Sequence, residues 1–171
     1  MIRLLTSPCA PKAVLMTGLA VWMTVAALNN ATDPATNMTH LRTMLSMDQL
    51  IADPVFGNGL EWRSWGGFPI GVLLAAIITW QAATALALWV AAVTMIRAAG
   101  TAALAPRATR RATLALTMFM AMWLVFLSGG LWFGYWMKQG PIQGVHFTML
   151  GVALLSLLFI NQSAGDRGTA A

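Results

Sequence analysis

The segment FPIGVLLAAIITWQAATALALWVAAVTMI, residues 68–96, contains no charged side chain and decides the fold class. As an α-helix its roughly 29 residues would extend about 43 Å, because each residue adds ~1.5 Å. The hydrocarbon core of a bilayer is ~30 Å thick and takes about 20 helical residues. The segment lacks the alternation of a barrel strand, and backbone groups in lipid must bond within their own segment. A tilted or protruding transmembrane helix is therefore predicted.

Three other apolar runs are long enough to cross a bilayer. The four spans are predicted at residues 13–29, 68–96, 112–136 and 142–160. Composition agrees, since 58% of the residues are hydrophobic and 9% are charged, against about 25% charged residues in soluble domains. A soluble fold of 171 residues could not hide that much apolar surface. The sequence predicts one membrane domain over residues 1–171, an all-α integral membrane four-helix bundle.

The basic residues predict the orientation of the spans. Seven of them fall on one side of the predicted membrane: Arg3, Lys12, Arg97, Arg107, Arg110, Arg111 and Arg167. The other side receives Arg42, Arg63 and Lys138 with most of the acidic residues. Loops rich in Lys and Arg remain in the cytoplasm, so both termini are predicted cytoplasmic. A cleaved signal peptide competes as an interpretation of the first span, but its apolar run is long and its cleavage site is poor.

The predicted outer loop, residues 30–67, is the one sizeable segment outside the membrane. Asn29 and Asn30 are expected to cap the first span, and Thr32, Asp33 and Pro34 to form a turn. Asn37 is the expected N-cap of a short amphipathic helix over residues 38–50. Its apolar face consists of Met38, Leu41, Met44 and Leu45. Helix ends and turns explain this polarity, and a binding role for the same residues remains the alternative.

Two motifs resemble a known family. They are NNATDPATNMTHLRTMLSMD, residues 29–48, and GGLWFGYW, residues 129–136. The first is similar to the NN-x-TD…N…L-x-MD segment and the second to the GG-x-WF…W segment of bacterial small integral membrane proteins of domain of unknown function 2165. The matching positions are Asn29, Asn30, Thr32, Asp33, Asn37, Leu45, Met47, Asp48, Gly129, Gly130, Trp132, Phe133 and Trp136.

The resemblance implies four spans in a bacterial inner membrane, and it implies no activity. Family members commonly carry an acidic residue within the second span, where this chain has Gln81, and Glu where it has Leu131. A function that depends on those acids would be altered here.

The spans offer little chemistry. None has an Asp, Glu, Lys or Arg in its interior, whereas ion paths and proton relays use such residues. Gln81 is the most polar central residue and is expected to bond to a neighbouring helix. His40 and His146 are not expected at matching depth, which disfavours a haem held by both. His146 is instead expected to bond to the connection between the last two spans.

No catalytic motif is present, so no enzymatic activity and no cofactor are predicted. Cys9, the single cysteine, excludes an intrachain disulfide. Arg107, Arg110 and Arg111 could bind anionic lipid headgroups, or they could only set the topology. Nucleic acid is not expected as a partner, because the basic residues lie at the ends of apolar runs.

The favoured hypothesis is a non-catalytic accessory or assembly subunit that packs against another membrane protein or another copy of itself. The alternatives are a small-molecule transporter or channel with Gln81 in its path, and a haem- or quinone-binding anchor using His146 and Trp132 or Trp136. The candidate partner- or ligand-binding residues are Asn29, Asn30, Thr32, Asp33, Asn37, Asp48, Gln81, Trp132, Trp136 and His146.

Overall fold

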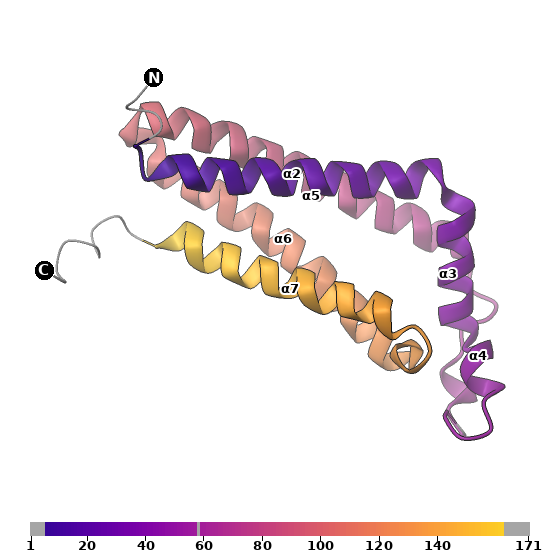
Figure 1. Ribbon diagram of the computed structural model, residues 1–171. Coiled ribbons are helices and arrows are strands. Elements are labelled where there is room, and N and C mark those ends of the chain that lie inside the picture. The colour runs from indigo at the N-terminus through magenta and orange to yellow at the C-terminus, as the bar shows by residue number, and fades with distance from the viewer. Residues whose placement is uncertain (1–5, 58, 163–171) are drawn as a thin grey trace, which may run out of the picture.

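The computed structural model describes residues 6–57 and 59–162, and these ranges contain helices and no strand. Four helices are long and apolar enough to cross a membrane. They are α2 (Cys9–Thr32), α5 (Ile70–Gly100), α6 (Ala105–Trp132) and α7 (Gly140–Asn161). Each packs mainly against its neighbours in the chain, and the contact between α2 and α5 is the most extensive (Figure 1). The predicted all-α four-helix membrane bundle is confirmed.

The helices begin where prolines allow them to. Pro34, Pro106 and Pro141 each stand in the first turn of a helix, where the missing N–H costs nothing and the fixed φ is already helical. Pro69 directly precedes α5. Three of the four long helices, α5, α6 and α7, therefore begin at or next to one of these prolines.

Some predicted segment boundaries differ from those of the helices. The first span, predicted over residues 13–29, lies within α2, which continues beyond it at both ends. There Lys12 and Thr32 find hydrogen-bond partners while remaining helical. The basic segment between the second and third spans was expected to be a loop. It is helical instead: Arg97 lies in the last turn of α5, and Arg107, Arg110 and Arg111 lie in the first two turns of α6. Only Thr101 and a short 3₁₀ helix, η2 (Ala102–Leu104), separate the two helices.

The beginning of α2 and the end of α7 lie at the same end of the bundle (Figure 1). Lys12 of α2 connects them, because its ammonium donates hydrogen bonds to the carbonyl oxygens of Ile160 at 2.6 Å and Gln162 at 2.9 Å. A cation there satisfies carbonyls that α7 leaves unpaired and complements the helix dipole. Arg3 and Arg167, which contributed to the predicted charge asymmetry, lie outside the described residues.

The core of the bundle combines small residues with flexible or aromatic ones. Ala20, Ala91, Ala92 and Ala112 are fully buried, and such residues let helix backbones approach closely in a membrane. The larger side chains that fill the remaining space are fully buried too, and they are Met16, Met23, Leu88, Met95, Leu116, Phe119 and Met122.

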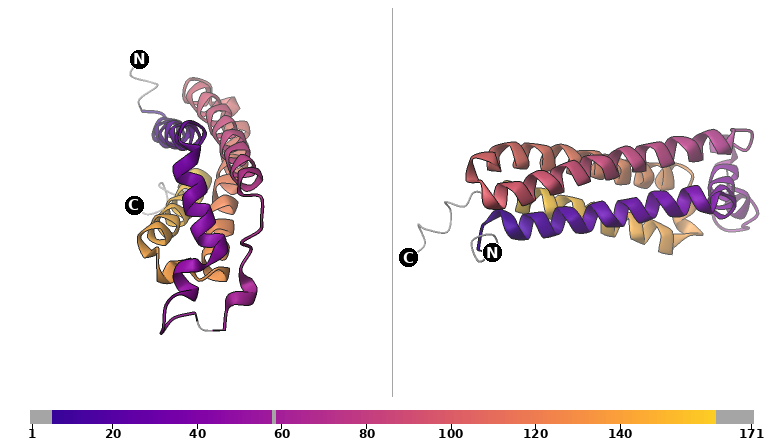
Figure 2. Two further views of the ribbon diagram at one scale, coloured as in Figure 1. Left: turned by 90° about the vertical axis from the view of Figure 1, so that its right-hand side faces the viewer. Right: turned by 90° about the horizontal axis from the view of Figure 1, so that it is seen from above.

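At the opposite end, α3 (Pro34–Ser46) crosses the bundle nearly at a right angle to α2, and α4 (Asp48–Ile51) follows it (Figures 1 and 2). Leu45, Met47, Leu50 and Phe133 are buried together there, and we call them the outer apolar cluster. Leu45 belongs to the predicted apolar face of the loop helix, and Met44 packs against the cluster. The predicted amphipathic helix is therefore confirmed, with different ends.

The start of that helix differs from the prediction. Asn29 and Asn30 lie inside α2 rather than capping it, and α3 begins at Pro34. Asp33 is the N-cap, because its carboxylate accepts a hydrogen bond from the N–H of Thr36 at 3.3 Å. Asn37, the predicted cap, lies within the first turns of α3 and donates to the carbonyl oxygen of Asp33 at 2.9 Å.

The end of α3 also differs from the prediction. The helix was expected to continue to residue 50, but it stops at Ser46 because Met47 adopts a left-handed conformation, with φ at 57°. Met47 has 2% of its surface exposed. Its burial in the outer apolar cluster offsets the cost of that conformation, which a non-glycine residue rarely adopts.

The connection between α6 and α7 is longer than the gap between the predicted spans 112–136 and 142–160. It runs from Phe133 to Gln139 and contains a 3₁₀ helix, η3 (Tyr135–Met137). The sequence spacing predicts that Gly130 and Gly134 share one face of a helix, but Gly134 lies beyond the end of α6 and starts this turn with φ at +62°. Gly130, within α6, permits the close approach of α7, because a Cβ there would lie 2.2 Å from Oε1 of Gln143.

Candidate functional site

Asn30 and Gln81 form a polar side-chain contact between two spans. The amide nitrogen of Asn30 on α2 donates to Oε1 of Gln81 on α5 at 2.7 Å, and Gln81 has 5% of its surface exposed. The expectation that Gln81 bonds to a neighbouring helix is confirmed. The bond fixes the register of α2 against α5, since an unpaired amide in an apolar interior is costly.

Thr84 lies three residues after Gln81 on the same buried face of α5. Its exposed surface is 0%, and its hydroxyl has no hydrogen-bond partner among the described residues. Threonine hydroxyls in helices ordinarily bond to the carbonyl four residues before, as Thr79 does to Ala75 at 2.8 Å. Gln81 and Thr84 together place two polar groups of one helix face inside the bundle.

His146 lies against the turn that joins α6 to α7. Its Nδ1 is 2.9 Å from the hydroxyl of Tyr135 in η3. The imidazole ring also packs on Trp123 and Phe126 of α6, with ring centroids 5.5 and 5.3 Å apart. The predicted bond from His146 to the connection is confirmed, and sequence reasoning had not named Tyr135 as its partner.

Two further polar atoms are buried beside His146. Nε1 of Trp123 and Oε1 of Gln143 have no hydrogen-bond partner among the described residues. Gln143 precedes His146 by three residues, which places the two on one face of α7. That spacing is the sequence signal that could have identified Gln143. Burial raises the pKa of the Tyr135 hydroxyl to about 12, so it stays protonated and can donate to His146.

An ion pair and a stacked arginine connect the outer loop to the end of the bundle. The Lys138 ammonium, just after η3, pairs with the Asp53 carboxylate. That bond and the backbone N–H groups of Val55 and Phe56 lower the pKa of Asp53 to about 2. The guanidinium of Arg63 lies 5.2 Å from the ring centroids of both Trp62 and Trp132. These contacts hold the loop between α2 and α5 in a folded conformation, and we call its described residues, 34–57 and 59–69, the outer platform.

The other candidate residues of the loop are spread over helix ends. Asn29 and Thr32 are exposed on the last turn of α2, where the Thr32 hydroxyl donates to the carbonyl oxygen of Leu28 at 2.7 Å. Asp48 is exposed at the start of α4. With Asp33 and Asn37 at the start of α3, these residues do not converge on one pocket. Their described contacts are those of helix termination and capping.

The aromatic and basic candidates lie on the surface. Trp132 is 43% and Trp136 47% exposed, so both can face the headgroup region, where Trp is enriched. Arg107 and Arg110 are exposed on the first turns of α6, whereas Arg111 is partly buried and donates to the Thr94 hydroxyl at 3.1 Å.

Within the described part of the chain, no group of three His, Cys, Asp or Glu side chains could hold a metal ion. His40 is exposed on α3 and His146 lies on α7. The histidines belong to separate elements, as expected from the sequence.

A family model described as a predicted small integral membrane protein, domain of unknown function 2165, matches residues 9–163. The match runs from the start of α2 to just beyond the end of α7. The chain belongs to this family. Comparisons with curated proteins and with solved structures found no match. As a member of the family it is an integral membrane protein, and the motif of residues 29–48 contributes the end of α2, the cap of α3 and two residues of the outer apolar cluster, Leu45 and Met47.

Proposed function

We propose that the protein is a non-catalytic membrane subunit that packs against another membrane protein, as an accessory or assembly factor. The observation that carries this proposal is the outer half of α5. On the side turned away from the bundle it exposes mainly small residues, Gly71, Ala75, Ala76, Thr79, Ala82 and Ala83, with Val72 as the large apolar residue among them. We call these the small-residue face.

Such a face suits a protein neighbour better than lipid. Small side chains let a second helix approach closely enough for extensive van der Waals contact, which drives association in a membrane. The inner half of the same side of α5 instead exposes large apolar residues, including Val90, Val93 and Ile96. Lipid chains cover large side chains as readily as a protein does, so the difference between the two halves favours a partner at the outer half.

The outer platform supports the same proposal. It lies at the outer end of α5 and presents Trp62, Val55 and Phe56, with 68%, 75% and 52% of their surfaces exposed. Aromatic residues are enriched in protein interfaces. A partner bound along the small-residue face could also contact this platform.

Purification in mild detergent tests the proposal. We expect recovery of the protein in a complex larger than the monomer, either with another membrane protein or as a homo-oligomer. Ala83→Leu should reduce the yield of that complex, because a large side chain there separates the helices. Gly144→Leu, on an exposed position of α7 with free space around it, is the matched control and should leave the complex intact. Consistent isolation of the wild-type protein as a lone monomer would exclude the proposal.

The two alternatives make different predictions. A transporter or channel would give liposome flux that Gln81→Leu abolishes, although the Asn30 bond already gives Gln81 a structural role. A haem-binding anchor would show a Soret band in the purified protein, and a quinone-binding anchor would release quinone on solvent extraction. The accessory role predicts none of these signals.

A further inference from the structure

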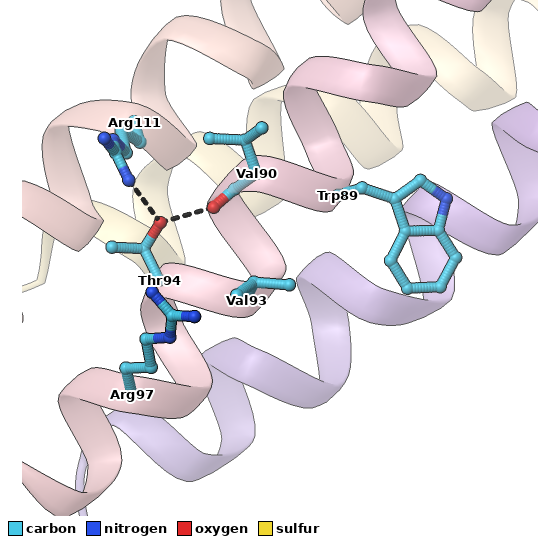
Figure 3. Close-up of a pocket in the computed structure, with 6 residues that line it drawn as sticks. All are labelled: Trp89, Val90, Val93, Thr94, Arg97 and Arg111. Carbon is cyan, nitrogen blue, oxygen red and sulfur yellow. Dashed lines mark hydrogen bonds between the residues drawn. The ribbon is translucent and has the colours of Figure 1, made fainter.

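A groove of about 240 Å³ lies on α5 at the end of the bundle opposite the outer platform (Figure 3). It is lined by Trp89, Val90, Val93, Thr94, Arg97 and Arg111, and we call it the basic groove. The first five residues come from the inner half of α5, and Arg111 reaches over from α6. The groove is therefore apolar toward the middle of the membrane and carries two guanidinium groups toward its surface.

The described contacts hold the polar end of the groove in place. Arg111 donates to the hydroxyl of Thr94 at 3.1 Å, and that hydroxyl bonds in turn to the carbonyl oxygen of Val90 (Figure 3). Trp89, at the apolar end, donates from its indole nitrogen to the hydroxyl of Thr24 on α2 at 3.1 Å. Both ends of the groove are thus fixed by bonds to neighbouring helices.

The positive charge of the groove is not neutralised by the described protein. Among residues 6–57 and 59–162, no carboxylate forms an ion pair with Arg97 or Arg111, and no hydrogen bond joins the guanidinium of Arg97 to another residue. Lys12, at the same end, by contrast donates hydrogen bonds to the carbonyl oxygens of Ile160 and Gln162 at the end of α7. Guanidinium groups bind phosphate through two parallel hydrogen bonds, so Arg97 retains its full capacity to bind an anion.

We propose that the basic groove binds one anionic phospholipid, with its phosphate at Arg97 and Arg111 and the upper part of an acyl chain along Val93 and Trp89. A free anion would use the two arginines alone and leave the apolar part of the groove empty. A lipid matches both parts in the order in which they lie across the membrane. The proposed site shares Arg111 with the expected headgroup residues Arg107, Arg110 and Arg111, and it adds Arg97; Arg107 and Arg110 do not line the groove.

Native mass spectrometry of the delipidated full-length protein in detergent tests this inference. The probes are phosphatidylglycerol, phosphatidylcholine and inorganic phosphate. We expect phosphatidylglycerol to bind more tightly than phosphatidylcholine and to occupy one preferred site. Arg97→Gln and Arg111→Gln should each weaken its binding roughly fivefold. Arg97→Gln is the decisive variant, because the side chain of Arg97 makes no described hydrogen bond whose loss could disturb folding.

Two controls separate the groove from general charge and from anion binding. Arg110→Gln removes the same charge from an exposed position of α6 and should leave the affinity for phosphatidylglycerol unchanged. Val93→Trp keeps both arginines and fills the apolar part, so it should weaken binding of the lipid. Equal binding of the two lipids would overturn the inference, and so would an Arg110→Gln loss as large as that of Arg97→Gln. Full competition by inorganic phosphate, with normal lipid binding by Val93→Trp, would overturn the lipid assignment.

Discussion

Gln81 illustrates how a single polar side chain can be recognised in the sequence while its partner cannot. An amide in the middle of an apolar span indicates a bond to a neighbouring helix. The partner, Asn30, is 51 positions away in the chain, and local reasoning assigned it to a helix cap. The contact appears only when α2 and α5 pack, because it joins the last turn of α2 to a residue well inside α5.

The Asn30–Gln81 bond gives the first prediction, which concerns the free energy of unfolding. Gln81→Leu and Asn30→Leu should each destabilise the protein, because each leaves the other amide unpaired. In a double-mutant cycle the coupling should be about 0.6 kcal/mol and at most about 1.7 kcal/mol, the range measured for interhelical bonds in membranes. Reversible unfolding in mixed micelles measures it. Thr79→Val is the control, since Thr79 bonds within its own helix, and fully additive single effects would contradict the prediction.

The ionisation of Tyr135 can be observed directly because it is the single tyrosine in the chain. Burial raises its pKa from 10.0 to about 12, so the absorbance of tyrosinate near 295 nm should rise with a midpoint near 12 in the folded protein. The unfolded state loses its proton first. The contribution of this hydroxyl to stability is therefore complete below pH 10 and decreases as the pH rises from 10 to 12.

A substitution of His146, the hydrogen-bond partner of Tyr135, provides the control for this titration. Replacing His146 by Phe keeps a ring on Trp123 and Phe126 but removes Nδ1, the atom that lies 2.9 Å from the Tyr135 hydroxyl. Burial is the cause of the raised pKa, so the midpoint should remain well above 10 in this variant. A midpoint near 10 in the wild-type protein would show that the Tyr135 hydroxyl is exposed to water.

The helices themselves were largely predictable, and their ends were less so. Four uninterrupted apolar runs required four helices, because lipid offers no other partner for their backbone groups. The ends depend on side-chain contacts. Thr32 remains helical because its hydroxyl bonds to the carbonyl oxygen of Leu28, and Asp33 caps α3, which begins at Pro34. Helix-ending and helix-starting residues stand next to one another here, so their types indicate a boundary without fixing its position.

The Asp53–Lys138 pair gives a prediction about the outer loop and its dependence on pH. The pKa of Asp53 is lowered from 3.8 to about 2, mainly because its carboxylate bonds to Lys138. The contribution of this carboxylate to stability is therefore complete above pH 3.8 and is lost as the pH falls through about 2. Hydrogen exchange of residues 53–57 should accelerate over that interval. Asp53→Asn should accelerate it already at neutral pH, since the amide cannot form the ion pair.

Glu61 supplies the comparison for this prediction. It is exposed in the same loop, and it makes one long contact of 3.4 Å, accepting from the N–H of Gly59. Glu61→Gln should leave the exchange of residues 53–57 unchanged at neutral pH. Equal effects of the two substitutions would mean that general loop charge, rather than the bond to Lys138, holds the segment in place.

Across the whole molecule, most of the described basic residues and the folded loop lie at opposite ends of the bundle. Lys12, Arg97, Arg107, Arg110 and Arg111 lie toward the end where α2 begins and α7 ends, and the folded platform lies at the other end. The sequence pattern predicted this division, because basic residues alternate with the spans. It could not predict the basic groove, since Arg111 joins Thr94 only after α5 and α6 pack as an antiparallel pair.

The last prediction is that the bundle lies in a bacterial inner membrane with its basic end in the cytoplasm. Loops rich in Lys and Arg are retained in the cytoplasm, so we expect the outer platform on the other side. With Cys9 replaced by Ser, a cysteine at Val55, which is 75% exposed, should react with a membrane-impermeant maleimide in intact spheroplasts. A cysteine at Ala103 in η2 should react only after permeabilisation. The opposite pattern would reverse the orientation and leave the helix packing unaffected. Labelling of both sites in sealed cells would mean that α5 does not cross the bilayer. The reasoning from the length of this helix, 31 residues, and from its mainly apolar composition would then fail.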